Sequence, residues 1–172
     1  MPFTPFHMGP GLFIKALLQG YFSLMIFGWT QILMDIQPLV VMLSGHGHVH
    51  GFTHTYIGAT VVALLAGLTG NYAAPFGLRL MRQSRFLPIK WPVIMISAFV
   101  GAYSHVLLDS FMHSDLQPFA PFAEMNPFLR SLTFTELHLL CLGSGLVGLV
   151  PYFLVAYWIR VMHLSSGPLD KR

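Results

Sequence analysis

WPVIMISAFVGAYSHVLLDSFM, residues 91–112, is the stretch of sequence that decides the fold. It is apolar along nearly its whole length, and as a helix it is long enough to cross the ~30 Å hydrocarbon core of a bilayer. One imidazole, His105, and one carboxylate, Asp109, interrupt it. A carboxylate inside a span costs roughly 2.5–3.5 kcal/mol even on lenient insertion scales, so it usually has a partner and a task. The stretch therefore predicts a transmembrane helix that carries part of a functional site.

The composition of the whole chain is typical of an integral membrane protein. Of its 172 residues, 55% are hydrophobic and only 9% are charged, whereas a soluble domain usually carries about 25% charged residues. The single cysteine, Cys141, excludes an intramolecular disulfide framework. The pI of about 9.3 arises mostly from one basic loop, so we do not expect a nucleic-acid partner.

Two further apolar stretches are long enough to span a bilayer, residues 55–78 and 137–162. The second has a face of small residues suited to close helix packing, formed by Ser144, Gly145 and Gly148. We therefore expect residues 1–172 to form a single all-α domain, a polytopic transmembrane helix bundle.

Positive charge is concentrated in the loop RLMRQSRFLPIK, residues 79–90, which contains Arg79, Arg82, Arg85 and Lys90. The positive-inside rule places this loop in the cytoplasm. Further basic residues follow the last span and fall on the same side, namely Arg160, Lys171 and Arg172. The sequence thus predicts a multi-pass protein of the bacterial inner membrane, with residues 44–54 and 113–133 facing the periplasm.

The N-terminal region allows two arrangements. Residues 1–43 can form a broken helix hairpin, in which Gly20 caps a short first helix and Ser23 begins the second. The alternative is one continuous helix, which would bring the number of full spans from three to four. The hairpin brings His7 close to Asp35, whereas a continuous helix would hold them ~40 Å apart. We expect the hairpin.

Two pairs of polar residues share the spacing of one helical turn. His105 and Asp109 lie on one helical face, and so do His50 and His54 in GHGHVHGFTHTY, residues 45–56. Two imidazoles at this spacing can chelate one metal ion. Both pairs lie toward the membrane face remote from the basic loop, which unrelated helix-packing groups would not be expected to do. The alternative interpretation of the His–Asp pair is a buried contact that only holds helices together.

Other polar residues fall near the same face. Pro38 places Asp35 near a helix end, and His7 precedes the first short helix. His113 lies one helical turn beyond Asp109, on the face shared by His105 and Asp109. Arg130 could neutralise an anionic substrate. Whether four further residues join the site is left open, namely His46, His48, Glu136 and His138. For Glu136 and His138, helix capping and interface roles are favoured.

The motifs HGFTHT, residues 50–55, and YSHVLLDSFMHSDLQPFAPF, residues 103–122, resemble the YdjM-like family of predicted membrane-bound, metal-dependent hydrolases. In that family an N-terminal histidine, an aspartate after the second helix, an HRGxTHS-type motif and an SHxxxD motif recur in this order. They correspond here to His7, Asp35, His50 with His54, and His105 with Asp109. The resemblance covers most of residues 1–122 and implies that these six side chains are metal ligands.

This sequence departs from the family pattern at two places. Gly51 stands where the family has the arginine of its HRG motif. The acidic run PDxD is reduced to MDIQ, so that Gln37 stands in place of a second acid. The number of ions is therefore left open, from one to three.

The family is distantly similar to zinc-dependent phospholipases C, which implies a phosphoester hydrolase at the membrane surface. A ligand set of imidazoles and carboxylates suits zinc, with manganese and iron as alternatives. The expected substrate is a lipid or polyprenyl phosphoester attacked by a metal-activated water. Asp35 is the expected bridging or basic carboxylate, His113 the expected proton donor and Arg130 the expected substrate contact. Membrane lipids are expected partners, and a homo-oligomer is possible.

Two other functions fit a metal-binding membrane protein. A divalent-metal transporter would need ligands that continue through the membrane, and residues 57–68 and 91–102 offer none. A structural protein, in which a metal only staples helices together, would close the coordination shell with protein ligands alone. Because the candidate ligands lie toward one membrane face only, an enzyme is favoured over a transporter.

Overall fold

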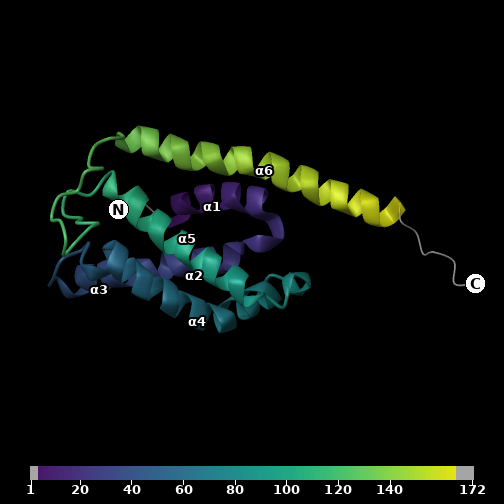
Figure 1. Cartoon of the computed structure of the whole chain (residues 1–172), viewed down its shortest axis with the longest axis horizontal. Helices are drawn as coiled ribbons and strands as arrows, with labels where there is room; N and C mark the ends of the chain where they lie inside the picture. Colours follow the sequence, from purple (N-terminus) through teal and green to yellow (C-terminus); the bar gives the residue numbers. More distant parts are fainter. Residues whose placement is uncertain (1–3, 166–172) are drawn as a thin grey trace, which may run out of the picture.

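The computed structural model describes residues 4–165, which form α-helices, short 3-10 helices and the connections between them, with no strand among them (Figure 1). The helices are α1 (Thr4–Leu18), α2 (Leu24–Met34), α3 (Ile36–Ser44), α4 (Tyr56–Leu80), α5 (Trp91–Ser110) and α6 (Phe134–Ser165). The predicted all-α class is confirmed. Lys171 and Arg172, which we expected on the cytoplasmic side, lie outside the described residues.

Within the described part of the chain, four stretches are long and apolar enough to cross a membrane. They are Leu24–Ser44, Tyr56–Leu80, Trp91–Ser110 and Phe134–Val155. The last three correspond to the predicted spans. The first combines α2 and α3, so the number of spans is that of the four-span alternative, although the N-terminal region is not one continuous helix. Helix α1 has only 15 residues and is too short to cross alone.

The N-terminal hairpin is present, with α1 folded back along α2 (Figure 1). Ser23 caps α2 as predicted, because its hydroxyl accepts a hydrogen bond from the Ile26 N–H. The prediction that Gly20 ends the first helix is wrong. The left-handed residue is Gln19, at φ 44°, and Lys15 stabilises this turn by donating from Nζ to the Gln19 carbonyl oxygen at 2.6 Å.

Three expectations for the ends of helices need correction. His7 lies inside α1, which begins at Thr4, and does not precede the helix. Pro38 does not end the helical stretch, because it occupies the first turn of α3, where a missing N–H leaves no helical hydrogen bond unmade. The α5 helix ends at Ser110, so His113 lies in the turn that follows. Asp35 is the single residue between α2 and α3. The expectation that His50 and His54 share a helical face is also wrong, because α4 begins only at Tyr56, and His50 lies in a turn while His54 lies in the short 3-10 helix Phe52–His54.

Helices α2, α4 and α5 pack around a core rich in alanine, which includes Ala63, Ala98 and Ala102. Small residues let these helices approach closely, as in many membrane bundles. Helix α6 packs against α1 instead, through the small face predicted for the last span. Gly145 lies against Gly9, and any side chain at Gly148 would meet the backbone of α1.

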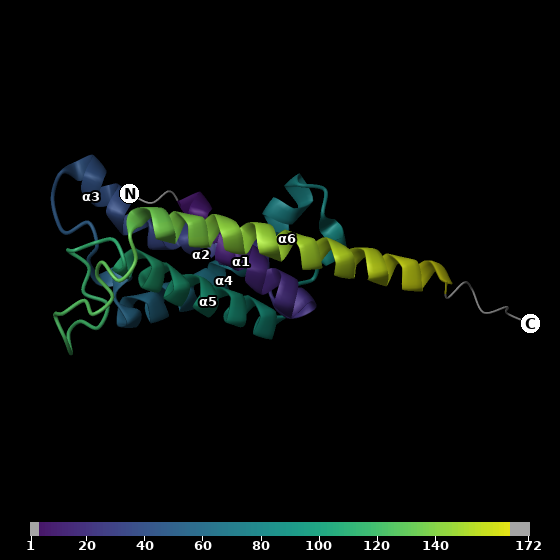
Figure 2. The ribbon, with the colours of Figure 1, turned by 90° about the horizontal axis from the view of Figure 1, so that it is seen from above.

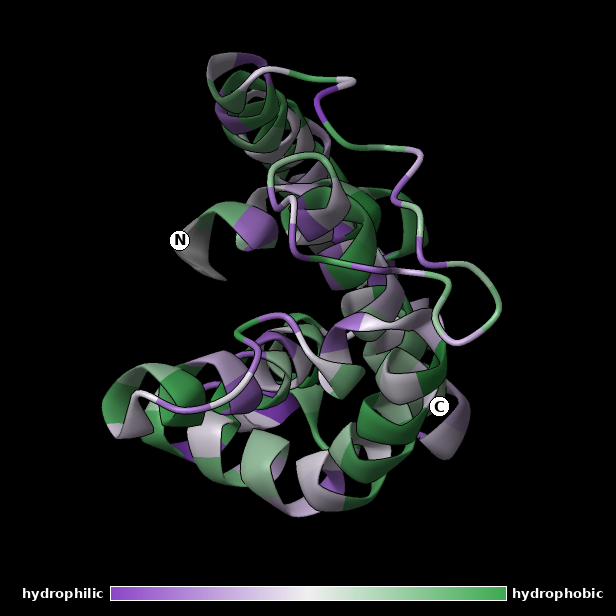
Figure 3. Ribbon diagram, turned by 90° about the vertical axis from the view of Figure 1, so that its left-hand side faces the viewer, coloured by the Kyte–Doolittle hydropathy of each residue, from purple (hydrophilic) through white to green (hydrophobic). Residues whose placement is uncertain are grey.

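The two ends of the bundle differ in chemistry. The histidine-rich segment before α4 and the long connection between α5 and α6 lie at one end, and the basic loop between α4 and α5 lies at the other (Figures 1 and 2). Figure 3 looks onto the first of these ends, where hydrophilic colour appears both along the loops and at places on the helices that approach them. The polar residues of the candidate site lie at this end.

Candidate metal centre

Seven polar side chains of the described residues meet at the end of the bundle remote from the basic loop. They are His7 from α1, Asp35 between α2 and α3, His50 and His54 before α4, His105 and Asp109 from α5, and His113 after α5. The set contains every residue that the family resemblance implied as a ligand. These side chains could hold a metal ion in three overlapping groups, which share His105 or Asp109.

Asp109 is the centre of this cluster. Its side chain is 4% exposed, and its two oxygens face three imidazoles. Oδ1 lies 3.4 Å from Nε2 of His7. Oδ2 lies 3.5 Å from Nε2 of His54 and 3.4 Å from Nε2 of His105. His105 then links the two acids, because its Nε2 also lies 3.4 Å from Oδ1 of Asp35.

These distances fit ligands that share an ion better than groups that share a proton. A charge-assisted N–H···O bond is usually about 2.7–2.9 Å long, and all four separations are longer. Two ligand atoms placed about 2.1 Å from a tetrahedral zinc ion are about 3.4 Å apart. These four pairs of atoms therefore have the spacing of ligands that share a metal ion.

The orientation of the His105 ring is fixed from behind by Gln31. The Gln31 amide donates from Nε2 to the Gly101 carbonyl oxygen at 3.0 Å, which identifies Oε1 as its acceptor. Nδ1 of His105 lies 2.8 Å from this Oε1 and must donate its proton there. The lone pair of the neutral ring is then on Nε2, which faces the carboxylates. Metal-ligating histidines are generally held in this way.

A second relay fixes the ring of His54. The Thr53 hydroxyl donates to Oε1 of Gln37 at 2.8 Å, so its own lone pair can accept from Nδ1 of His54 at 3.0 Å. Again the lone pair at Nε2 faces Asp109. Gln37, which stands where the family pattern has a second acid, thus serves as an acceptor behind the site.

His50 is oriented by an acid that the sequence analysis missed. Both oxygens of Asp115 accept from Nδ1 of His50, at 3.0 and 2.9 Å. Burial alone would raise the pKa of Asp115, but the hydrogen bonds from His50 lower it. The His50 ring also packs on His113, with 3.9 Å between ring centroids.

Several buried atoms of the site have no hydrogen-bond partner within the described residues. They are both ring nitrogens of His7, Nε2 of His54, His105 and His113, and Oδ1 of Asp109. Leaving a buried polar atom unsatisfied costs about 1–3 kcal/mol, and this cost would be relieved by a cation. Burial lowers the pKa of His54 and of His113, which favours the neutral imidazole that a metal requires. The residues therefore fit a divalent ion held by nitrogen and oxygen.

The histidines and the acid left open by the sequence have other contacts. Glu136 accepts from the backbone N–H of Thr133 at 2.8 Å, a capping box at the start of α6. Nδ1 of His138 lies 2.7 Å from the Phe134 carbonyl oxygen. His46 and His48 are exposed in the loop after α3. Among the described residues, none of the three groups that could hold a metal includes any of these four.

The backbone of Arg130 contacts the residue that follows α5. Its N–H donates to the Phe111 carbonyl oxygen at 3.0 Å, and its side chain is exposed. The structure therefore places the guanidinium at the surface beside the end of α5. Its role in binding a substrate stays a prediction.

A cavity of about 560 Å³ reaches the outer edge of the cluster. His48, His50 and Asp115 form polar parts of its wall, and Phe52 and Ile57 form apolar parts. Phe52 is 58% exposed. The approach to the cluster is therefore amphipathic.

Comparison with known proteins does not assign this site. No protein-family model, curated protein or solved structure matches the chain. The resemblance of its motifs to the YdjM-like hydrolases stays a prediction. The convergence of the histidines and aspartates is established by the structure alone.

Asp115 offers a test of the orienting contacts. Replacing it with alanine should weaken metal binding about tenfold, because groups that orient a metal-ligating histidine typically contribute 10–100-fold to affinity. Competition between the purified protein and a calibrated chelator measures the affinity. Glu124→Ala is the matched control, since Glu124 is an exposed acid in the same connection. Equal affinities for the two variants would show that Asp115 does not orient a ligand.

Proposed function

We propose that the protein is a membrane-embedded, metal-dependent hydrolase that cleaves a phosphoester of a lipid or polyprenyl substrate. One observation carries the proposal. His54 and His105 each have Nδ1 bound to a fixed acceptor, and each presents Nε2 to the buried carboxylate of Asp109. Such an arrangement prepares imidazoles for a metal ion.

The residues that would hold the metal are those of the converging set, from His7 to Asp109. His113, which the sequence predicts as a proton donor and not as a ligand, is a further candidate. The set lacks thiolates, so zinc suits it, as do manganese and iron. A divalent ion at this position would acidify a bound water and neutralise charge on a phosphoryl oxygen. We propose one to three ions.

The two aspartates would have different tasks. Asp109 is 4% exposed and faces three imidazoles, so its task would be to bind the metal ion together with these histidines. Asp35 is 30% exposed at its side chain, and its Oδ1 lies 3.4 Å from the same Nε2 of His105. Asp35 is thus the carboxylate that a water or substrate can reach, and its oxygen would accept the proton of the attacking water. His113 is half-buried beside His50. If it does not bind the metal, it would take up a proton and deliver it to the leaving group, against the lowering of its pKa by burial.

The surroundings of the site suit an amphiphilic substrate. The cavity beside His50 has polar and apolar walls, and the apolar side chains of Phe52 and Ile57 are exposed at its edge. A polar head group could reach the cluster from this side while its hydrocarbon tails stay in the membrane. By the positive-inside rule the site would face the periplasm of a bacterial inner membrane.

A transporter is less well supported, because the candidate ligands lie at one end of the bundle. Helices α4 and α5 continue toward the basic loop, and their sequences contain no histidine or acid beyond His105 and Asp109. A conduit would need a second set of ligands along that path.

Removal of bound metal is the experiment that tests the proposal. The purified protein, stripped with a chelator, should lose hydrolysis of bis(p-nitrophenyl) phosphate and of phosphatidyl lipids, and zinc or manganese should restore it. His54→Ala should lose both metal and activity. His46→Ala removes an exposed histidine and should retain both. Full activity of the metal-free protein would end the proposal.

A further inference from the structure

A cleft of about 790 Å³ lies at the opposite end of the bundle from the metal centre. It is bounded by the turn between α1 and α2, by α6, and by the basic loop that joins α4 to α5. Its walls are largely apolar and include Phe22, Val93 and Phe153. A mostly apolar cleft of this volume on a membrane helix bundle is large enough to take up part of a hydrocarbon chain.

Three cations line this apolar cleft, namely Lys15, Arg85 and Lys90, and no acid is among its described lining residues. Lys15 is held by hydrogen bonds from Nζ to the carbonyl oxygens of Gln19 and Phe22, at 2.6 and 2.7 Å. The cleft therefore combines positive charge with apolar surface. That combination is complementary to an amphiphile with an anionic head group.

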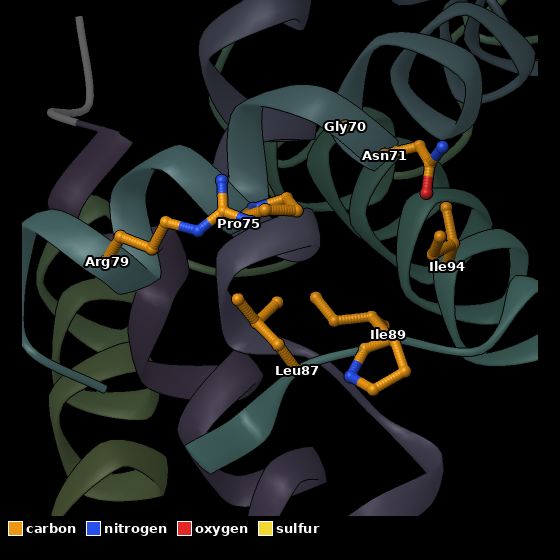
Figure 4. A pocket seen from close by; sticks show the side chains of 8 residues that line it. Gly70, Asn71, Pro75, Arg79, Leu87, Ile89 and Ile94 are labelled. Atoms are coloured by element: carbon orange, nitrogen blue, oxygen red, sulfur yellow. The ribbon is translucent and has the colours of Figure 1, made fainter. Parts of the chain in front are cut away.

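Basic residues of this loop line two different pockets. On the other side of the segment from Leu87 to Ile89 lies a smaller pocket of about 140 Å³, where Arg79 extends alongside Pro75 (Figure 4). Arg85 and Lys90 line the larger cleft, whereas Arg82 lines neither of these two pockets. The four loop cations thus differ in position although they are close in sequence.

We propose that the larger cleft binds an anionic phospholipid, with its phosphate among Lys15, Arg85 and Lys90 and its acyl chains against the apolar wall. Basic pockets between membrane helices are suited to acidic lipid head groups. Aromatic residues that anchor proteins at the membrane interface surround the cleft, including Tyr21 and Tyr152. This site is independent of the proposed hydrolase activity.

The test is a lipid titration of the intact protein in detergent, followed by native mass spectrometry. The probes are dioleoyl phosphatidylglycerol and, as the neutral comparison, dioleoyl phosphatidylcholine. The wild type should bind the first more tightly. Arg85→Gln and Lys90→Gln should each lower its affinity about fivefold, in keeping with the typical contribution of one cation at an anionic lipid surface.

Arg82→Gln is the matched control, because it removes the same charge from the same loop outside the cleft. It should leave phosphatidylglycerol affinity unchanged, and Lys90→Arg should retain it. Thermal unfolding in phosphatidylcholine nanodiscs checks that each variant is folded. An equal loss in Arg82→Gln, or equal affinity of the wild type for the two lipids, would overturn the proposal.

Discussion

Replacing Asp109 with asparagine should abolish stoichiometric metal binding in the purified protein. The substitution keeps the size of the side chain but removes the charge that faces the imidazoles of His7, His54 and His105. We expect metal affinity to fall by more than about 100-fold, since groups that only orient ligands already contribute 10–100-fold. Elemental analysis after dialysis against a weak chelator measures the metal content. Phosphoester hydrolysis should fall with it.

Glu136→Gln is the control for this substitution. Glu136 is another acid near the same end of the bundle, but its contacts are with Thr133 in the capping box of α6. Its variant should keep the full metal content. If Asp109→Asn also kept its full metal content, Asp109 would not be a ligand, and the two groups that contain it would be excluded as metal sites.

Replacing Gly148 with valine should separate α6 from α1 and destabilise the protein. A Cβ atom at this position would lie 2.7 Å from the backbone nitrogen and Cα of Phe13, and backbone atoms cannot move aside as a side chain can. Overpacking of this kind costs about 1–3 kcal/mol even in cores that can adjust, and we expect at least about 2 kcal/mol here. Because α1 carries His7, the variant should also bind metal less tightly.

Gly143→Val provides a matched control on the same helix. A Cβ at Gly143 has no described atom within 4 Å apart from its neighbours on the helix. The two variants therefore differ in the contact with α1 and not in the type of substitution. Thermal unfolding in detergent should show a large decrease in midpoint for Gly148→Val and a small one for Gly143→Val. Equal midpoints would contradict the close approach of α1 and α6.

The spans and the convergence of the site could be predicted because both follow from the cost of polarity in a membrane. A carboxylate such as Asp109 needs partners when it lies in an apolar helix, and the spacing of one turn placed His105 beside it. The hairpin followed from the sequence LQGYFS, residues 18–23. The position of the left-handed residue did not follow from it, because Lys15 stabilises the turn at Gln19 through a contact that local sequence rules do not describe.

The residues that orient the ligands could not be predicted from the sequence. Gln31 is polar in an apolar helix, which is a usable signal, but its bond to His105 depends on how α2 packs against α5. Asp115 lies in a connection without regular structure, so neither spacing nor periodicity pointed to His50. These contacts are tertiary, and they determine which nitrogen of each ring faces the site.

X-ray absorption at the zinc edge of the metal-loaded protein tests most directly whether these histidines and aspartates form a metal centre. We expect a shell of nitrogen and oxygen at about 2.0–2.1 Å with the multiple scattering of imidazole rings, and loss of this signal in His54→Ala. A sulfur neighbour at about 2.3 Å, which only Cys141 or a methionine could supply, or a shell of water oxygens without imidazole, would contradict it.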